Sequence, residues 1–434
     1  MKSLKFIILF LVICLVYFFG WLLLPLEPVF QVGLEGILML VLGIIAVPLG
    51  FLSSFAFKSY FNRSAMVSHS APFHYGINSA ILDRLSNRVN IIGLIGCVCI
   101  LLDRLYVRDL SLLAGFLESR ELMEDTVTSS FGLIGNFLSG MAVFSLGLMF
   151  LSKAISHNVT FRRKLLCYLI SLLFIITQLM VGSRSGILVV VLVSIFFMLW
   201  SKYIKNVPII TSNLMYLLLI GFVFIILMGQ IFLMRIDEMG LTPIDSILYS
   251  GYGYAVQPSN SFLQFVDQLG PIKNLWLSLT TTFMYVYHGM YEFFILVNDF
   301  NGDYAYGRVS FWFPIKILAY IGVDLGGFDI EGLDGVRVGV FTTFLGPLYI
   351  DFGVFMPIVV FVLFFLLGLI AMNVRTTNLV WLPFGAILAA TLTMFPIMNL
   401  MLTASGIYPL VASFFIPLLT KKLVLPSRRL SRIG

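Results

Sequence analysis

Ten long apolar runs, each long enough to cross a bilayer, constrain the fold of this chain more than any other feature. In the hydrocarbon core of a bilayer every backbone polar group must be satisfied within the protein, and a helix of about 20 residues achieves this within one segment. With 60% hydrophobic and 11% charged residues, the chain is predicted to be an all-α polytopic membrane protein. The predicted spans are residues 4–24, 33–56, 89–106, 131–152, 165–182, 187–201, 207–232, 341–373, 379–400 and 407–424.

The basic residues indicate which ends of these spans face the cytoplasm. If the N-terminus is inside, the inner loops and tails carry 18 of the 27 Lys and Arg residues and only one acid, Asp83. An excess of Lys and Arg in short loops is typical of the cytoplasmic side, so both termini are predicted to be cytoplasmic. The net charge of +6 is then a topology signal and predicts no nucleic-acid partner.

The predicted spans divide the chain into three parts. Residues 1–233 form an N-terminal bundle of about seven spans, with a cytoplasmic loop at 57–88. Residues 234–340 form a long periplasmic segment, and residues 341–434 form a C-terminal bundle with a basic cytoplasmic tail.

The long periplasmic segment contains two further apolar stretches, 275–298 and 309–323. If both crossed the membrane, the protein would have twelve spans. The loop between them, 299–307, would then lie inside with two acids and no Lys or Arg, against the charge pattern of the other inner loops. We therefore expect about ten spans, with interfacial or re-entrant helices in this segment.

Cysteine and histidine usage argues against a metal centre and against a disulfide framework. The four cysteines all lie in apolar runs, and the chain has only four histidines. Cysteines in such positions are more often small buried apolar residues than ligands. We therefore predict neither a metal nor a cofactor.

The segment Gly182-Ser-Arg-Ser-Gly186 is a tight bend between two apolar runs, and the charge pattern places it on the outer face. A charge at the edge of the membrane is costly unless it is used or reaches the interface. The glycines and serines can expose backbone N–H groups beside Arg184, and its guanidinium is a permanently charged fork of donors. Arg184 is therefore either a snorkelling interfacial arginine or a contact for a phosphate at headgroup depth.

The long periplasmic segment carries further arginines among many tyrosines. One arginine can bind two phosphate oxygens at the same time. The candidate ligands for a phosphate or a glycan are therefore Arg235, Arg308 and Arg337. Aromatic faces stack on sugar rings, although tyrosine also concentrates at membrane interfaces for its own stability. An aromatic belt would explain about half of these tyrosines.

His288 and Glu292 lie four residues apart in a tyrosine-rich stretch. If the stretch is helical, the two side chains share one face, and the carboxylate could orient or charge the imidazole. His288 would then be a candidate general base for a hydroxyl nucleophile. A hydrogen-bonded structural pair is the alternative interpretation.

Asp351 and Tyr349 belong to the motif Thr342 to Gly353, which opens the next apolar run. A carboxylate inside apolar sequence is costly unless it is paired, and an outer arginine is the partner that the sequence suggests. Asp351 is a candidate catalytic residue, or else part of an ion pair that fixes the loop to the bundle. Tyr349 is a candidate glycan contact.

Four features, in chain order, resemble the O-antigen or oligosaccharide repeat-unit polymerase family. They are the Gly182–Gly186 bend, the long outer segment, the stretch Gly307-Arg308…Pro314…Gly322, and the motif Thr342…Gly346-Pro-Leu-Tyr-Ile-Asp-Phe-Gly353. The resemblance extends over residues 167–373. It implies a fold similar to GT-C glycosyltransferases.

The resemblance also implies an activity. Such enzymes join undecaprenyl-pyrophosphate-linked oligosaccharides on the periplasmic side of the bacterial inner membrane, without a nucleotide sugar. The donor and acceptor lipids and the bilayer would be the partners, and a chain-length regulator protein would be a further one. Outer arginines would hold the pyrophosphate, and a base such as His288 would activate the acceptor hydroxyl.

Two other functions compete with this interpretation. An O-antigen ligase uses the same donor and has a similar layout, so the bend and the outer segment do not separate it from a polymerase. A flippase or other transporter of lipid-linked oligosaccharides would carry charged residues at the middle of the bundle. Here the charged residues concentrate outside the spans, which disfavours a transporter.

Overall fold

The computed structural model describes residues 3–65, 79–109, 129–156, 159–180, 183–204, 242–249, 253–302, 304–320, 335–337, 339–374 and 379–424, with short pieces at 229, 240, 251, 322–323 and 333. The described chain is mostly helical. Its main elements are α1 Ser3–Leu23, β1 Leu26–Pro28, α2 Leu34–Ala65, α3 Ser79–Leu102, α5 Ser130–Ser139, α6 Ser145–Ser156, α7 Phe161–Leu179, α8 Arg184–Ile204, α10 Pro243–Tyr249, β2 Val256–Pro258, α11 Asn260–Asp267, α12 Lys273–Asp299, α13 Trp312–Tyr320, α14 Gly346–Phe352, α15 Met356–Ala371, α16 Leu382–Met394 and α17 Ala404–Val424.

Six of the described helical segments are long and apolar enough to cross a membrane. Together with the predominance of helix, these segments agree with an all-α membrane protein, apart from the short β1–β2 pair. The six segments are 4–23, 34–61, 82–107, 131–155, 185–204 and 346–371.

Four predicted spans have no counterpart among these six. Helix α7 carries three consecutive basic residues, 162–164, in its first turn, which leave only its remainder, 165–179, without charge. Helix α16 with the 3-10 turn before it, and α17 as far as Thr420, form shorter apolar segments at 379–394 and 404–420. The predicted span 207–232 lies outside the described residues, except for Gly229.

Several spans are interrupted in ways that hydropathy does not encode. Helix α3 continues as a π-helix over Asp103–Val107, and α5 and α6 are joined through a short 3-10 turn at Ala142–Phe144. Gly353, with φ of +52°, separates α14 from α15, since a positive φ is readily adopted by glycine.

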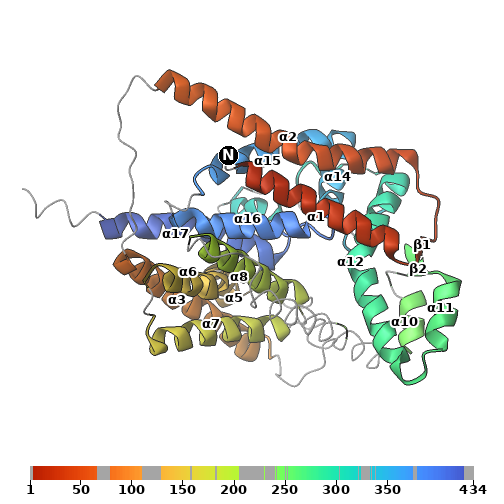
Figure 1. Ribbon diagram of the computed structural model, residues 1–434, viewed down its shortest axis with the longest axis horizontal. Helices are drawn as coiled ribbons and strands as arrows, with labels where there is room; N and C mark the ends of the chain where they lie inside the picture. Colours follow the sequence, from red (N-terminus) through yellow and green to blue (C-terminus); the bar gives the residue numbers. More distant parts are fainter. Residues whose placement is uncertain are drawn as a thin grey trace, which may run out of the picture.

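The main helices run in broadly similar directions, while α12 crosses them at one end of the bundle (Figure 1). Helices α1 and α2 reach α12 with the ends that flank their connecting loop. Strand β1 of that loop pairs antiparallel with β2, so that Glu27 lies opposite Gln257. Helices α10 and α11 lie beside α12 in the same region, which is the predicted outer side.

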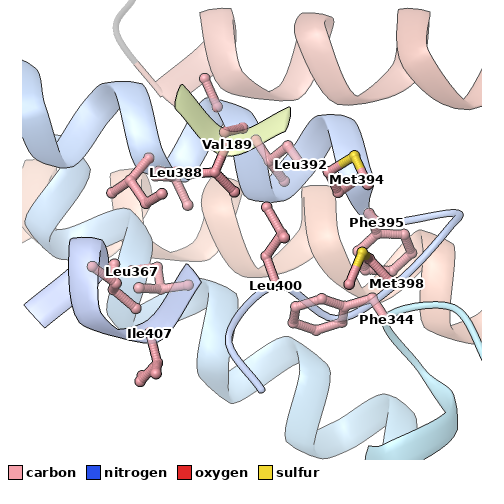
Figure 2. Close-up of a cluster of buried hydrophobic side chains, with 14 of the residues drawn as sticks. Val189, Phe344, Leu367, Leu388, Leu392, Met394, Phe395, Met398, Leu400 and Ile407 are labelled. Carbon is pink, nitrogen blue, oxygen red and sulfur yellow. The ribbon is translucent and has the colours of Figure 1, made fainter. Parts of the chain in front are cut away.

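One large core joins the helices from both halves of the chain. Figure 2 shows part of it, to which α8 contributes Val189, α16 contributes Leu392, α15 contributes Leu367 and α17 contributes Ile407. Phe344 stacks on Phe395 there, with ring centroids 4.9 Å apart. The segment that follows Arg337 is thereby attached to the bundle.

Small residues let α2 and α15 approach closely. A Cβ atom at Gly50 would lie 2.6 Å from the Phe361 carbonyl oxygen and 2.9 Å from the Phe365 nitrogen. Close backbone packing of this kind is a main source of helix association in membranes, where the hydrophobic effect does not act between helices.

Candidate active site beside helix α12

Helix α12 is held against the end of the bundle by its tyrosines. The Tyr17 ring of α1 packs on Tyr287, with centroids 4.6 Å apart, and the Trp21 indole donates a 2.5 Å hydrogen bond to the Tyr291 hydroxyl. A Cβ atom at Gly289 would lie 2.7 Å from the carbonyl oxygen of Ile397. Glycine at this position therefore lets the helix approach the α16–α17 connection closely.

Two of the predicted site residues form an ion pair on α12. The Arg337 Nη1 atom donates a 2.6 Å hydrogen bond to Glu292 Oε1, and the carboxylate side chain is 1% exposed. The Arg337 Nη2 atom donates to the Gly251 carbonyl oxygen at 2.7 Å. The guanidinium also lies over the Tyr254 ring, 4.2 Å from its centroid, a cation–π contact.

The backbone before Arg337 explains how this side chain reaches α12. Gly335 has φ of +78°, and a Cβ atom there would lie 2.5 Å from the Asp299 carbonyl oxygen at the end of α12. Glycine thus allows the chain to turn tightly over the end of the helix. Two residues later, Arg337 reaches back along the helix to Glu292.

Burial and the ion pair have opposite effects on the pKa of Glu292. Desolvation raises the pKa of this carboxyl group to about 7, while the Arg337 guanidinium lowers it and so limits the rise. A carboxylate with a pKa near neutrality can accept a proton from a hydroxyl group and release it again at physiological pH.

His288 shares the buried face of α12 with Glu292, and each has a partner of its own. The His288 ring is fully buried, and its Nδ1 atom lies 3.0 Å from the Met284 carbonyl oxygen. Because a carbonyl oxygen only accepts, Nδ1 carries the proton of the neutral ring. Burial lowers the pKa of His288 to about 4, and Arg337 contributes in the same direction. The imidazole is therefore neutral at physiological pH.

An open cavity of about 620 Å³ lies beside the last turns of α12. Its walls come from the α1–α2 connection, the segment between α10 and β2, and α12 itself. Apolar side chains such as Phe30 and Ile295 form part of the lining. The polar groups that line it are Gln31, Tyr254, Gln257, Asn298 and Asp299.

Tyr254 connects the cavity to the ion pair, because its ring lines the cavity and also lies under Arg337. Amide and carboxylate groups around an aromatic ring suit the hydroxyl groups and the apolar faces of a sugar. The cavity walls are fixed by backbone pairing between β1 and β2 and by the 3.2 Å hydrogen bond from Asn298 to the Gln31 carbonyl oxygen.

Asp351 fixes a loop. Its carboxylate is fully buried and accepts hydrogen bonds from the backbone N–H groups of Val309 (3.0 Å) and Ser310 (2.6 Å). These amides take the place of the arginine partner that the sequence suggests. Arg308 lies in the same turn, with an exposed side chain.

Tyr349 is buried between aromatic rings. Its ring centroid lies 6.1 Å from that of Phe293 and 6.4 Å from that of Phe300. Tyr349 therefore packs α14 against α12, and it does not line the cavity described above.

The remaining predicted site residues are located only by the backbone or not at all. Arg184 is the first residue of α8, and its side chain lies outside the described part, as does Arg235 entirely. The next residue, Ser185, forms a 2.8 Å hydrogen bond with Ser405 of α17. The bend is thereby joined to the C-terminal bundle.

The structure thus brings His288, Glu292 and Arg337 together. The sequence indicates Tyr254 only as one of many tyrosines that could stack on sugar rings, and it gives no signal for Asn298 or Gln31. The polar, turn-prone stretch 257–261 is a candidate sugar-contacting loop in the sequence, and Gln257 within it lines the cavity.

Models of protein families, curated proteins and solved structures give no match to this chain. The fold and the site define its class: a helical membrane protein in which a buried carboxylate pairs with a partly exposed guanidinium beside a polar and aromatic cavity.

Proposed function

We propose that this protein is a glycosyltransferase that polymerises undecaprenyl-pyrophosphate-linked oligosaccharide repeat units. The product is O-antigen or a related surface polysaccharide, made on the periplasmic side of the bacterial inner membrane. The observation that carries the proposal is the ion pair of the buried Glu292 carboxylate with the partly exposed Arg337, next to the polar cavity. The resemblance of residues 167–373 to repeat-unit polymerases supports the same activity.

The charged pair supplies the two functions that such a transfer needs. The acceptor hydroxyl attacks the anomeric carbon of the donor glycan, and the bond from that carbon to the pyrophosphate oxygen breaks. The lipid pyrophosphate leaves with the bonding electrons, and the hydroxyl proton goes to the Glu292 carboxylate. Arg337 stabilises the charge that develops on the leaving group.

The ion pair also explains how the base is kept deprotonated without substrate. In the free protein Arg337 binds Glu292. A pyrophosphate competes for the guanidinium, because one guanidinium can donate two parallel hydrogen bonds to two phosphate oxygens. The carboxylate then loses its cationic partner and becomes more basic when both substrates are present.

The other predicted site residues take supporting roles in this scheme. His288, neutral and hydrogen-bonded within α12, stabilises the helix face that carries Glu292 and is a poorer base because its pKa is about 4. Asp351 positions the Arg308 turn through backbone amides. Arg184 and Arg235 are proposed contacts for the donor pyrophosphate.

The proposal is tested by Glu292→Gln, which preserves the size of the side chain and removes its basicity. Loss of a general base lowers rates by about 10²–10⁴-fold, so long polysaccharide chains should disappear at a normal protein level. The measurement is the ladder of chain lengths on the surface lipid of cells. Glu27→Gln, at an exposed carboxylate of β1, is the matched control and should keep the ladder.

The pattern of bands separates the polymerase from its closest rival. Loss of a polymerase leaves single repeat units on the surface lipid, whereas loss of a ligase leaves none. A full ladder in Glu292→Gln would contradict the role given to this carboxylate. A complete absence of repeat units on the lipid would indicate a ligase.

A further inference from the structure

A second cavity, of about 270 Å³, lies between α5, α13 and α17. It is lined by apolar side chains, and Lys316 is the one charged residue among the described residues of its lining. None of the lining residues belongs to the cavity beside α12 or to the Glu292–Arg337 pair. Its lining includes Ile134, Phe137, Phe313, Ile317 and Tyr408.

Aromatic contacts keep the three helices at this spacing. The Phe313 ring of α13 packs edge-on against Tyr408 of α17, with centroids 5.6 Å apart. The Trp312 indole donates a 2.8 Å hydrogen bond to the Leu402 carbonyl oxygen. Phe137 of α5 packs on Phe415 of α17 at 5.5 Å. The apolar groove is therefore built into the fold.

The groove borders surface that faces lipid in a membrane-embedded protein. Ile134 and Ile317 in its wall are about half exposed, and Phe131 and Phe415 next to it are similarly exposed. Exposed apolar side chains of this size on membrane helices contact hydrocarbon. Lys316 can bury its aliphatic stem along the groove and keep its ammonium group at headgroup depth.

We propose that this groove binds one acyl chain of an anionic bilayer phospholipid, with the lipid phosphate on Lys316. The apolar walls suit the hydrocarbon chain, and one ammonium group matches the single negative charge of a phosphodiester. A pyrophosphate carries more charge than one lysine neutralises. This inference is independent of the proposed function, because it concerns a different cavity and lipid binding alone.

The experiment measures which lipids the purified protein retains. The protein in detergent is incubated with equal amounts of phosphatidylglycerol and phosphatidylcholine that have identical acyl chains, and bound lipids are counted by native mass spectrometry. Phosphatidylglycerol should be retained preferentially. A lysine near a membrane surface contributes about 1 kcal/mol of attraction to anionic lipid, so Lys316→Gln should reduce this preference about fivefold.

Two further variants test the location of the site. Lys273→Gln removes another lysine, which pairs with Asp267 on the surface away from the groove, and should leave the preference unchanged. Ile134→Trp fills the groove and should reduce retention of both lipids. Because Lys316 is exposed, Lys316→Gln is expected to preserve the fold.

Three results would overturn the proposal. They are equal retention of both phospholipids by the unmodified protein, an unchanged preference in Lys316→Gln, and displacement of the bound phospholipid by an equimolar polyprenyl pyrophosphate. The last result would assign the groove to a lipid-linked substrate. None of these measurements depends on polysaccharide synthesis, so they stand apart from a failure of the proposed function.

Discussion

The ion pair between Arg337 and Glu292 of α12 keeps a buried carboxyl group more acidic than burial alone would make it. Glu292 has a pKa of about 7 because desolvation raises the value and Arg337 opposes the rise. Removing Arg337 would leave the buried carboxyl group without its cation, so that burial would favour its neutral form. A pair with these properties is sensitive to both pH and the arrival of a competing anion.

Replacement of Arg337 should move the pH dependence of polymer synthesis. Arg337 lowers the pKa of Glu292, so Arg337→Gln should raise it further. If deprotonated Glu292 is the base, the rate rises with pH through this pKa. The midpoint should therefore shift to higher pH, with part of the lost rate recovered at pH 9.

Initial rates of polymer formation in isolated membranes between pH 5.5 and 9 measure this shift. Lys273→Gln, which removes a cation outside the site, is expected to keep the midpoint of the unmodified protein. An unchanged midpoint in Arg337→Gln would remove Glu292 from the titrating step.

His288 should make the protein less stable in mild acid. Its pKa of about 4 in the folded protein lies below its ordinary value of 6.5, so the unfolded chain binds a proton that the folded chain does not. Above pH 6.5 the ring is neutral in both states and its burial costs no protonation energy. As the pH falls from 6.5 towards 4, the free energy of unfolding decreases by on the order of 3 kcal/mol.

Thermal unfolding of the detergent-solubilised protein tests this effect. The difference in Tm between the unmodified protein and His288→Gln should shrink or reverse from pH 7.5 to pH 5. The same difference at all pH values would show that the ring is not excluded from protonation in the folded state.

The sequence identified part of this residue arrangement and missed the rest for a physical reason. Spacing of four residues in a helical stretch placed His288 and Glu292 on one face, because helical geometry is local. The partner of Glu292 lies 45 residues further along the chain. That contact depends on the turn at Gly335, which no local periodicity encodes.

At the scale of helices, close packing of α2 on α15 depends on Gly50. Gly50→Ala would force a Cβ atom against the backbone of Phe361 and Phe365, which cannot move without separating the helices. Overpacking of this kind costs about 1–3 kcal/mol, and we expect a lower Tm.

Gly43→Ala on the same helix is the matched comparison. Its Cβ atom would meet the Leu345 Cδ1 atom at 2.6 Å, which is the end of a flexible side chain. Both substitutions bring the same gain in helix propensity, so a smaller loss of Tm for Gly43→Ala isolates the backbone contact. Equal losses would contradict the close packing.

Hydropathy predicted the positions of most helices and none of their interruptions. Burial in lipid requires helices wherever the chain is apolar, so their existence follows from local sequence. The break between α5 and α6 instead depends on tertiary packing: a Cβ atom at Gly140 would lie 2.6 Å from the Tyr408 carbonyl oxygen of α17. The crosswise direction of α12 likewise follows from its contacts with α1 and α2.

At the scale of the whole molecule, the charge pattern predicts opposite locations for the two ends of the bundle. Ser261 of α11 should lie outside, and Lys153 of α6 should lie in the cytoplasm; both are exposed. In a variant without the four native cysteines, Ser261→Cys should react with a membrane-impermeant maleimide in intact spheroplasts.

Lys153→Cys should react only after the membrane is permeabilised. The extent of labelling, measured on gels before and after permeabilisation, gives the orientation directly. Labelling of both cysteines in intact spheroplasts, or the reverse pattern, would contradict the predicted topology and with it the periplasmic location of α12.

The pairing of β1 with β2 has a consequence for the order of synthesis. Leu26–Pro28 leaves the ribosome early, whereas its partner, Val256–Pro258, follows more than 200 residues later. At 5–20 residues per second, the first strand waits on the order of tens of seconds for its partner. The walls that the cavity beside α12 takes from β2 and from α12 itself do not exist in that interval. A chain interrupted before residue 256 would therefore contain α1 and α2 but could not assemble the cavity.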